Sequence, residues 1–216
     1  DLSKSEYGTF AAPDTNRVIR NTYKLLALST GVAAVGAGIS MLAGFGPLTG
    51  IVFTLLGLVP LFYLSKHRDS ASAVPAMLTF TGLSGLGLGP ILTHYLSLPG
   101  GSATVMTAAV LTTAVTLALT GYVHKTGKDF TRMGGFLFAG LIVVLLASIA
   151  AIFVPAMQAG VSAVAALLFS GFILFDTSRL IRGEEDNYVM AACSMYLNVL
   201  NLFLSILQLL GFSVDD

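Results

Sequence analysis

The fold of this chain follows from the stretch Val161–Phe212, which reads VSAVAALLFSGFILFDTSRLIRGEEDNYVMAACSMYLNVLNLFLSILQLLGF. It contains two long apolar runs, and one acid, Asp176, lies near the end of the first run. Polar side chains recur in the second run at intervals of four, three, four and three residues, at Ser194, Asn198, Asn201, Ser205 and Gln208. This spacing places them on one stripe of a helix. Because a polar stripe is unfavourable against lipid, it predicts a helix inside a membrane bundle, with the stripe facing other helices or water.

The composition of the whole chain agrees with a membrane protein. Charged residues make up 10% of the 216 residues, against about 25% in an average soluble domain. Hydrophobic residues make up 55%, and the mean hydropathy is +0.85. The net charge is zero, so no basic field indicates a nucleic-acid partner. The single cysteine, Cys193, excludes an intramolecular disulfide and a two-cysteine metal site, and we interpret it as a small core residue.

Seven segments are long and apolar enough to span a bilayer, whose hydrocarbon core of about 30 Å needs about 20 helical residues. They lie near residues 25–44, 47–65, 74–96, 103–123, 134–154, 160–181 and 188–211. The sequence therefore predicts an all-α, polytopic integral membrane protein with one seven-helix domain over residues 25–212. Residues 1–24 are polar and are predicted to form a mobile tail before it.

The positive charges predict the orientation in the bilayer. All eleven Lys and Arg residues lie in the first 24 residues or near residues 66–68, 125–132 and 179–182. With seven spans, these segments share one side of the membrane, and the connections on the other side carry no Lys or Arg. The positive-inside rule then predicts a cytoplasmic N-terminus and a C-terminus outside.

Asp176 is the only acid within an apolar span, and an intramembrane carboxylate is costly and by default functional. A role in ion or proton handling, or in gating, is one interpretation. The other is structural: Arg179, three residues further on, could pair with the carboxylate, or the carboxylate could reach the interface. Asn198 is the stripe residue best placed to meet Asp176. Straight helices would leave an axial offset of roughly 6 Å between them, so contact requires some stagger.

The polar stripe has two interpretations as well. It could line a water path, or it could hold helices together through hydrogen bonds of about 0.6 kcal/mol each. We favour the second interpretation for Ser205 and Gln208. The three histidines are scattered, so no metal site is predicted, and a weak cation site at Asp176 stays open. No phosphate loop or dinucleotide motif indicates a cofactor. The motif Gly82–Gly85 resembles that of serine intramembrane proteases, but no histidine or lysine lies near enough to act as its base.

Several short motifs carry a family resemblance. They are Phe175–Thr177, Gly183, Asn187–Val189, Ser194–Leu197, Asn201–Ser205 and Leu209–Gly211. In this order and spacing they resemble the C-terminal signature of the Bax inhibitor-1 family, also called the transmembrane Bax inhibitor motif family. Arg20–Tyr23 and Gly89–Leu92, followed by Tyr95–Leu96, are similar to its Gram-negative, YccA-like branch.

The resemblance implies a seven-helix bundle in which the last helix is central and surrounded by the other six. It implies no enzymatic chemistry and no cofactor. YccA-like members bind and restrain the membrane AAA+ protease FtsH. For this chain the resemblance implies the bacterial inner membrane, where the C-terminus predicted to lie outside would be periplasmic. Other members are pH-sensitive calcium leaks. The resemblance therefore implies an FtsH modulator first and a calcium or proton pathway second.

One departure from the family pattern concerns the calcium-leak members. In these, aspartates on the sixth and seventh helices share a proton and gate the path. The first aspartate matches Asp176, and the second falls at Asn198. We therefore predict that the shared-proton switch is absent or altered here. The residues predicted for an ion pathway or its gate are Asp176, Asn198, Ser194, Asn201 and Arg179.

Overall fold

The computed structural model describes residues 15–212, which form seven long helices. These are α1 (Thr15–Leu42), α2 (Pro47–Lys66), α3 (Ala73–Ser97), α4 (Gly101–Thr126), α5 (Gly134–Phe153), α6 (Gln158–Ile181) and α7 (Tyr188–Phe212). Short 3-10 turns, η1 (Thr131–Met133) and η2 (Pro155–Met157), precede α5 and α6. All seven helices are long and apolar enough to cross a membrane, and no strand occurs within the described range. The predicted all-α, multi-pass membrane fold is confirmed.

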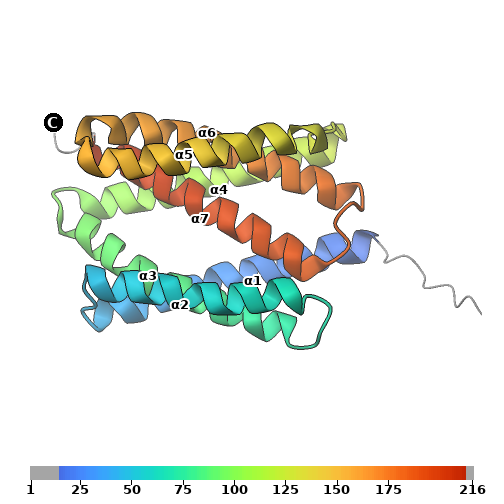
Figure 1. Ribbon diagram of the computed structural model, residues 1–216, viewed down its shortest axis with the longest axis horizontal. Coiled ribbons are helices and arrows are strands. Elements are labelled where there is room, and N and C mark those ends of the chain that lie inside the picture. Colours follow the sequence, from blue (N-terminus) through green and yellow to red (C-terminus); the bar gives the residue numbers. More distant parts are fainter. Residues whose placement is uncertain (1–14, 213–216) are drawn as a thin grey trace, which may run out of the picture.

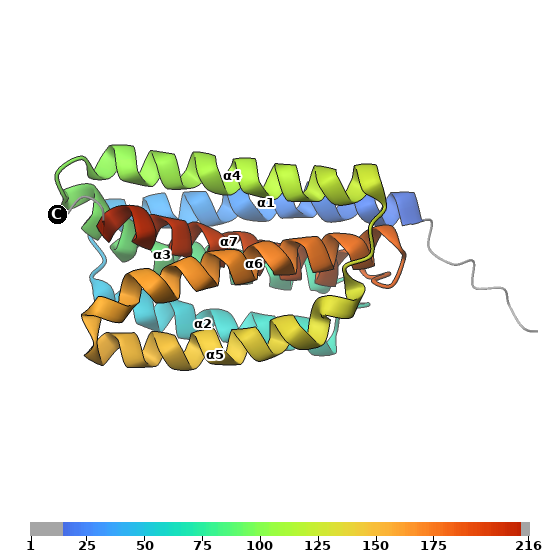
Figure 2. The same cartoon turned by 90° about the horizontal axis from the view of Figure 1, so that it is seen from above.

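The helices form two layers on either side of α7. One layer holds α1, α2 and α3, the other holds α4, α5 and α6, and α7 runs obliquely between them (Figure 1). Figure 2 shows α7 in the middle of the bundle, with α2 and α5 along one side. The last helix packs against α1, α3, α4 and α6, whereas α2 and α5 pack mainly against α3 and α6. The last helix is therefore central, as predicted, but its direct neighbours are chiefly four helices rather than six.

Small residues allow α1 and α3 to approach closely. A side chain at Gly85 of α3 would collide with the backbone of Ala33 on α1. A Cβ atom at Gly36 of α1 would lie 2.7 Å from the carbonyl oxygen of Gly82. In a bilayer the hydrophobic effect does not drive helices together, because lipid tails are themselves apolar. Close contact between backbones instead contributes van der Waals attraction between the two helices. These glycines therefore allow the close packing of α1 against α3.

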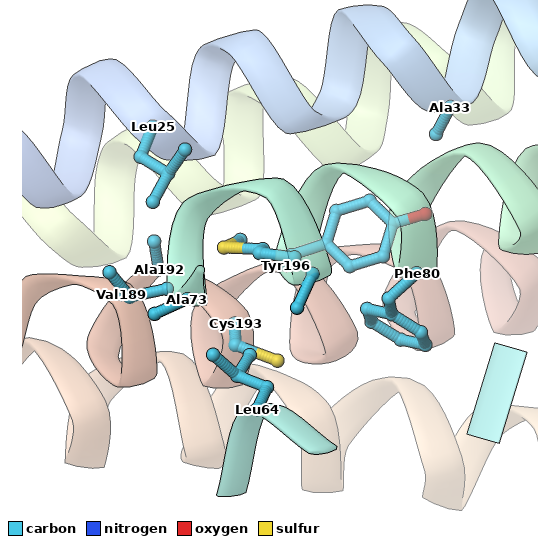
Figure 3. Packing of buried hydrophobic residues seen from close by; sticks show 11 residues of the cluster. Leu25, Ala33, Leu64, Ala73, Phe80, Val189, Ala192, Cys193 and Tyr196 are labelled. Atoms are coloured by element: carbon cyan, nitrogen blue, oxygen red, sulfur yellow. The ribbon is translucent and has the colours of Figure 1, made fainter. Parts of the chain in front are cut away.

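The largest buried cluster joins the first layer to the central helix. Its members come from α1, α2, α3 and α7 and include Leu25, Leu64, Phe80, Cys193 and Tyr196 (Figure 3). The rings of Phe80 and Tyr196 meet edge to face, with centroids 5.8 Å apart. Cys193 is buried within this cluster, in agreement with its interpretation as a small core residue.

The first helix begins at Thr15, so the prediction of a tail through residue 24 is wrong for residues 15–24. At 28 residues, α1 is about 42 Å long, and its first turns extend beyond a hydrocarbon core of about 30 Å. This extension is held by a hydrophobic contact, in which Val18 is buried with Leu180, Ala191 and Met195. Arg17, Arg20 and Lys24 lie on the exposed face. The predicted tail residues 1–14 lie outside the described range.

The two ends of the bundle differ in charge. Within residues 15–212, every Asp, Glu, Lys and Arg except Asp176 lies at the end that holds the start of α1 and the connections 67–72, 127–133 and 182–187. We call this the charged end. The connections at the opposite, neutral end are 43–46, 98–100 and 154–157. Asp176 is thus the one Asp, Glu, Lys or Arg within residues 15–212 that lies inside the bundle rather than at its charged end.

Candidate functional site

The candidate site is the carboxylate of Asp176 on α6, which faces α7 and is 7% exposed. Its Oδ2 atom accepts a hydrogen bond of 2.5 Å from the hydroxyl of Ser194. The same oxygen accepts a hydrogen bond of 2.7 Å from the side-chain amide of Asn198. Ser194 and Asn198 are one turn apart on α7, so both reach one acceptor. The structure therefore brings together three of the five residues predicted for the site.

The helices are staggered enough for this contact, since the amide of Asn198 reaches Asp176. The last helix crosses the bundle obliquely (Figure 1). Hydrogen bonds to an ionised group are shorter and roughly twice as strong as those between neutral groups. Asp176 is thus held by neutral donors of the central helix, and no ion pair within residues 15–212 includes it.

Arg179 does not pair with Asp176. Its Nη2 atom lies 3.3 Å from Oε2 of Glu185 in the connection between α6 and α7. Its guanidinium also lies over the ring of Phe175, 5.6 Å from the ring centre. The structural alternative, a direct ion pair between Arg179 and Asp176, is therefore wrong, and Arg179 instead fixes the turn that leads into α7.

The remaining stripe residues do not contact Asp176. Asn201 donates to the carbonyl of Leu197 at 2.8 Å, one turn back on its own helix. Ser205 donates to the carbonyl of Asn201 at 2.7 Å, so our expectation of an interhelical bond for Ser205 is wrong. Gln208 accepts a bond of 2.8 Å from the hydroxyl of Ser162 on α6, which matches that expectation. The stripe thus makes polar contacts with α6 at two levels of the bundle. Ser194 and Asn198 contact Asp176, and Gln208 contacts Ser162 near the neutral end.

Asn187 is a structural residue of the charged end that the sequence analysis missed. Its Oδ1 atom accepts from the backbone N–H groups of Val189 and Met190 at 3.0 Å each, which caps the first turn of α7. Its Nδ2 atom donates to the carbonyl of Arg68 at 2.8 Å and to Asp69 at 3.0 Å. The central helix is thereby tied to the connection between α2 and α3. An Asn directly before an apolar run is the signal that predicts such a cap.

A contact between Tyr23 and His124 was also missed. The hydroxyl of Tyr23 on α1 lies 3.0 Å from Nε2 of His124 on α4. The two rings are tilted against each other, with centroids 5.9 Å apart. This pair joins the first helix of one layer to the first helix of the other at the charged end. The 101 residues between the partners leave no local signal from which the pairing could be predicted.

The connection between α4 and α5 is fixed by Asp129, whose side chain is exposed to solvent. The backbone N–H and the hydroxyl of Thr131 donate to its Oδ1 atom at 2.9 and 2.8 Å. These bonds, and then the charges of Arg182 and Arg132, hold the pKa of this carboxyl below its usual value. Because the pKa is lowered in the folded chain, the stabilisation from these interactions is fully present at a pH above the usual pKa of an aspartate. It is lost only as the pH falls through the lowered pKa. Asp129 thus stays ionised at neutral pH.

The described part of the chain contains no group of three or more His, Cys, Asp or Glu side chains that could hold a metal ion. Asp176 stands with a hydroxyl and an amide, both directed at the same carboxylate oxygen. Such a set can hold a negative charge or a proton on Asp176.

Comparison with known proteins gives the relationship of the chain. Residues 15–215 match the family described as inhibitor of apoptosis-promoting Bax1. An uncharacterized membrane protein of Vibrio cholerae is 45% identical over 201 residues, which cover 92% of this chain and 90% of the relative. The protein of Escherichia coli K12 named modulator of FtsH protease YccA is 40% identical over 205 residues, covering 94% and 93%. A relative with the same identity in Escherichia coli O6:H1 is named inner membrane protein YccA. The chain therefore belongs to the Bax inhibitor-1 family.

Proposed function

We propose that this chain is a non-enzymatic regulator in the bacterial inner membrane that modulates the membrane protease FtsH. The observation that carries the proposal is the likeness to the Escherichia coli modulator of FtsH, 40% identical over 94% of this chain. This likeness extends over all seven helices rather than over one motif. The name of a second relative, inner membrane protein YccA, supports the same membrane.

The charged end offers a surface for the soluble part of such a partner. We place this end in the cytoplasm, because it holds all the Lys and Arg residues of the described range. Here the extension of α1 presents Arg17, Arg20 and Lys24 to the solvent, while Val18 anchors it to α6 and α7. The extension is therefore a fixed basic surface, and we propose that FtsH contacts it.

The test is co-purification with FtsH, together with FtsH-dependent degradation of a membrane substrate in proteoliposomes. The native chain should bind FtsH and slow degradation. The double change Arg17→Glu and Arg20→Glu should weaken both effects, since it reverses exposed charges without touching Val18. Lys66→Glu, at an exposed position of α2, is the matched control. Failure of the native chain to co-purify with FtsH contradicts the proposal.

Removal of the residues before Thr15 tests a separate contribution. The cut should end at residue 14, because Val18 belongs to the folded bundle. If the shortened chain binds and restrains FtsH fully, those first residues play no part in the regulation. If binding persists but restraint is lost, they act after the complex has formed.

A second candidate function is a cation or proton leak, and the observation in its favour is the buried Asp176 carboxylate against the central helix. The test is calcium uptake into proteoliposomes at pH 6 and pH 8 for the native chain and for Asp176→Asn. Asp129→Asn, which changes a carboxyl in an exposed connection, is the control. A pH-dependent flux that only Asp176→Asn alters would support a leak, and no flux above that of empty liposomes would remove it.

A further inference from the structure

A small polar pocket lies at the neutral end of the bundle, between α3 of one layer and α5 and α6 of the other, beside α7. It encloses about 270 Å³. The chain contains only two glutamines, Gln158 and Gln208, and both line this pocket. Ser148, Ser162 and Tyr95 add hydroxyl groups to its lining, and no acidic or basic side chain lines it. The pocket is therefore polar but uncharged.

The side chain of Gln208 on α7 offers a hydrogen-bond donor to this pocket. Its Oε1 atom accepts from the buried hydroxyl of Ser162 at 2.8 Å. This bond holds the carbonyl end of the amide against α6. The amide nitrogen, Nε2, has no hydrogen-bond acceptor within residues 15–212, and the side chain is exposed. Its N–H groups are therefore free to donate to a ligand.

The side chain of Gln158 on α6 offers an acceptor in the same way. Its Nε2 atom donates to the carbonyl of Ala151 at 3.3 Å, in the last turn of α5, where carbonyls lack a partner in their own helix. Its Oε1 atom has no donor among the described residues and is left to accept. Ser162, which holds Gln208, lies one turn after Gln158, about 6 Å along α6. A free donor and a free acceptor thus lie about one helix turn apart.

The pocket lies at the level of the lipid headgroups. Gln158 is the first residue of α6, and Ser148 lies five residues, about 8 Å, before the end of α5. The interfacial region on each side of the hydrocarbon core is about 5–8 Å thick. Ile152 of α5 lines the pocket and is 71% exposed, as expected for an apolar side chain that faces lipid. A lipid headgroup can therefore enter from the side of α5.

The free donor and acceptor distinguish between headgroups. A hydroxyl group can accept from the amide of Gln208 and donate to Oε1 of Gln158. The ammonium group of phosphatidylethanolamine can only donate, and a cation placed in a pocket without a carboxylate is unfavourable. The trimethylammonium group of phosphatidylcholine has no N–H or O–H to donate. The pocket therefore fits a headgroup that carries hydroxyl groups.

We propose that this pocket binds the glycerol headgroup of phosphatidylglycerol from the leaflet at the neutral end, with one hydroxyl between Gln208 and Gln158. The acyl chains of the lipid then lie along the surface of α5 beside Ile152. Such a lipid site is independent of the proposed contact with FtsH at the charged end.

The test measures lipid binding to the purified full-length chain in detergent by native mass spectrometry. The native chain should bind phosphatidylglycerol about tenfold or more tightly than phosphatidylethanolamine. Gln208→Met keeps the length of the side chain but removes the amide, so this preference should shrink to about twofold or less. Thr107→Met, at an exposed position of α4 outside the pocket, is the control and should keep the full preference.

A second variant, Gln158→Met, leaves the bond between Ser162 and Gln208 in place and should also lose the preference. Binding of phosphatidylethanolamine should stay unchanged in all three variants, which separates loss of the site from loss of the fold. No preference in the native chain would overturn the inference. A preference that both glutamine variants keep, or that Thr107→Met loses as well, would overturn it too.

Free glycerol distinguishes a lipid from a soluble ligand of the same chemistry. At the same concentration as phosphatidylglycerol it should not displace the lipid, because it lacks the acyl chains that lie beside α5. Displacement of the lipid by free glycerol would make a soluble polyol the ligand and would overturn the assignment to a lipid.

Discussion

At the scale of single residues, substitutions of Asp176 can distinguish the effect of its hydrogen bonds from the effect of its charge. This is possible because both donors, Ser194 and Asn198, bond to the same oxygen. An Asn at this position can direct its one carbonyl oxygen at Ser194 and Asn198 and keep both bonds. An Ala cannot, and each buried donor left unpaired costs about 1–3 kcal/mol. Asp176→Ala should therefore lower the thermal unfolding midpoint in detergent clearly more than Asp176→Asn does, as followed by circular dichroism. Equal midpoints would show that these hydrogen bonds contribute little to stability.

Asn198 is the position at which a shared-proton pair can be restored. In Asn198→Asp two carboxyl groups meet where the native donor and acceptor atoms are 2.7 Å apart. One shared proton keeps a hydrogen bond, whereas two ionised carboxylates repel each other. The unfolding midpoint of this variant should therefore fall between pH 5 and pH 8 by more than that of the native chain. Asn201→Asp is the control, since Asn201 bonds only to its own helix. A similar fall in both variants would contradict a specific pair at Asp176.

The sequence predicted contacts of single residues correctly where the periodicity of one helix was enough to place the side chains. The spacing of Ser194 and Asn198 placed both on the face that meets Asp176, and the structure brings them together. The partner of Arg179 could not be predicted in this way. Arg179 reaches Glu185 because the chain turns back at Gly183, whose φ of +71° suits glycine. Helix periodicity carries no information about side chains beyond such a turn.

At the scale of single elements, the joint between the central helix and the connection before α3 depends on Asn187. Asn187→Ala removes the cap of α7 and the two bonds to the 68–69 backbone and side chain. Loss of a cap costs about 0.5–2 kcal/mol. Amide hydrogen exchange in the first turn of α7 should therefore become faster, and exchange near residues 68–73 should rise with it.

Asn187→Asp is the matched comparison for this joint. An aspartate can still accept from the N–H groups of Val189 and Met190, but it cannot donate to the carbonyl of Arg68. Exchange should then rise near residues 68–73 while the first turn of α7 stays protected. If both variants leave exchange near residues 68–73 unchanged, Asn187 does not couple the two segments.

Element boundaries were predictable wherever apolar character alone decides them. The second span was expected near 47–65 and the helix is Pro47–Lys66, and the last was expected near 188–211 and the helix is Tyr188–Phe212. The start of α1 was not predictable in this way. Its first turns are mostly polar, and Val18 holds them to the bundle by packing against Leu180 and Met195 of helices distant in sequence. A contact between distant segments decided this boundary.

At the scale of the whole molecule, hydropathy predicted the number of helices but not their arrangement. The central place of α7 followed from the family resemblance, and its polar stripe is consistent with it. A groove of about 410 Å³, lined by residues of α1, α3, α4 and α7, could not be predicted, because small residues such as Ala34 and Ala109 also occur on helices that pack tightly. Only the distance between the two layers turns them into the walls of a groove.

The separation of charge along the whole bundle predicts its orientation, which labelling of single cysteines measures. The native Cys193 is buried and should react little, so it serves as the background. A cysteine in place of Ser70, in the connection at the charged end, should be protected from a membrane-impermeant maleimide in intact spheroplasts and react after lysis. A cysteine in place of Ser102, beside the connection at the neutral end, should react before lysis. The reverse pattern would place the charged end outside, where the basic extension of α1 could not meet a cytoplasmic domain of FtsH, and would thus remove the proposed contact there.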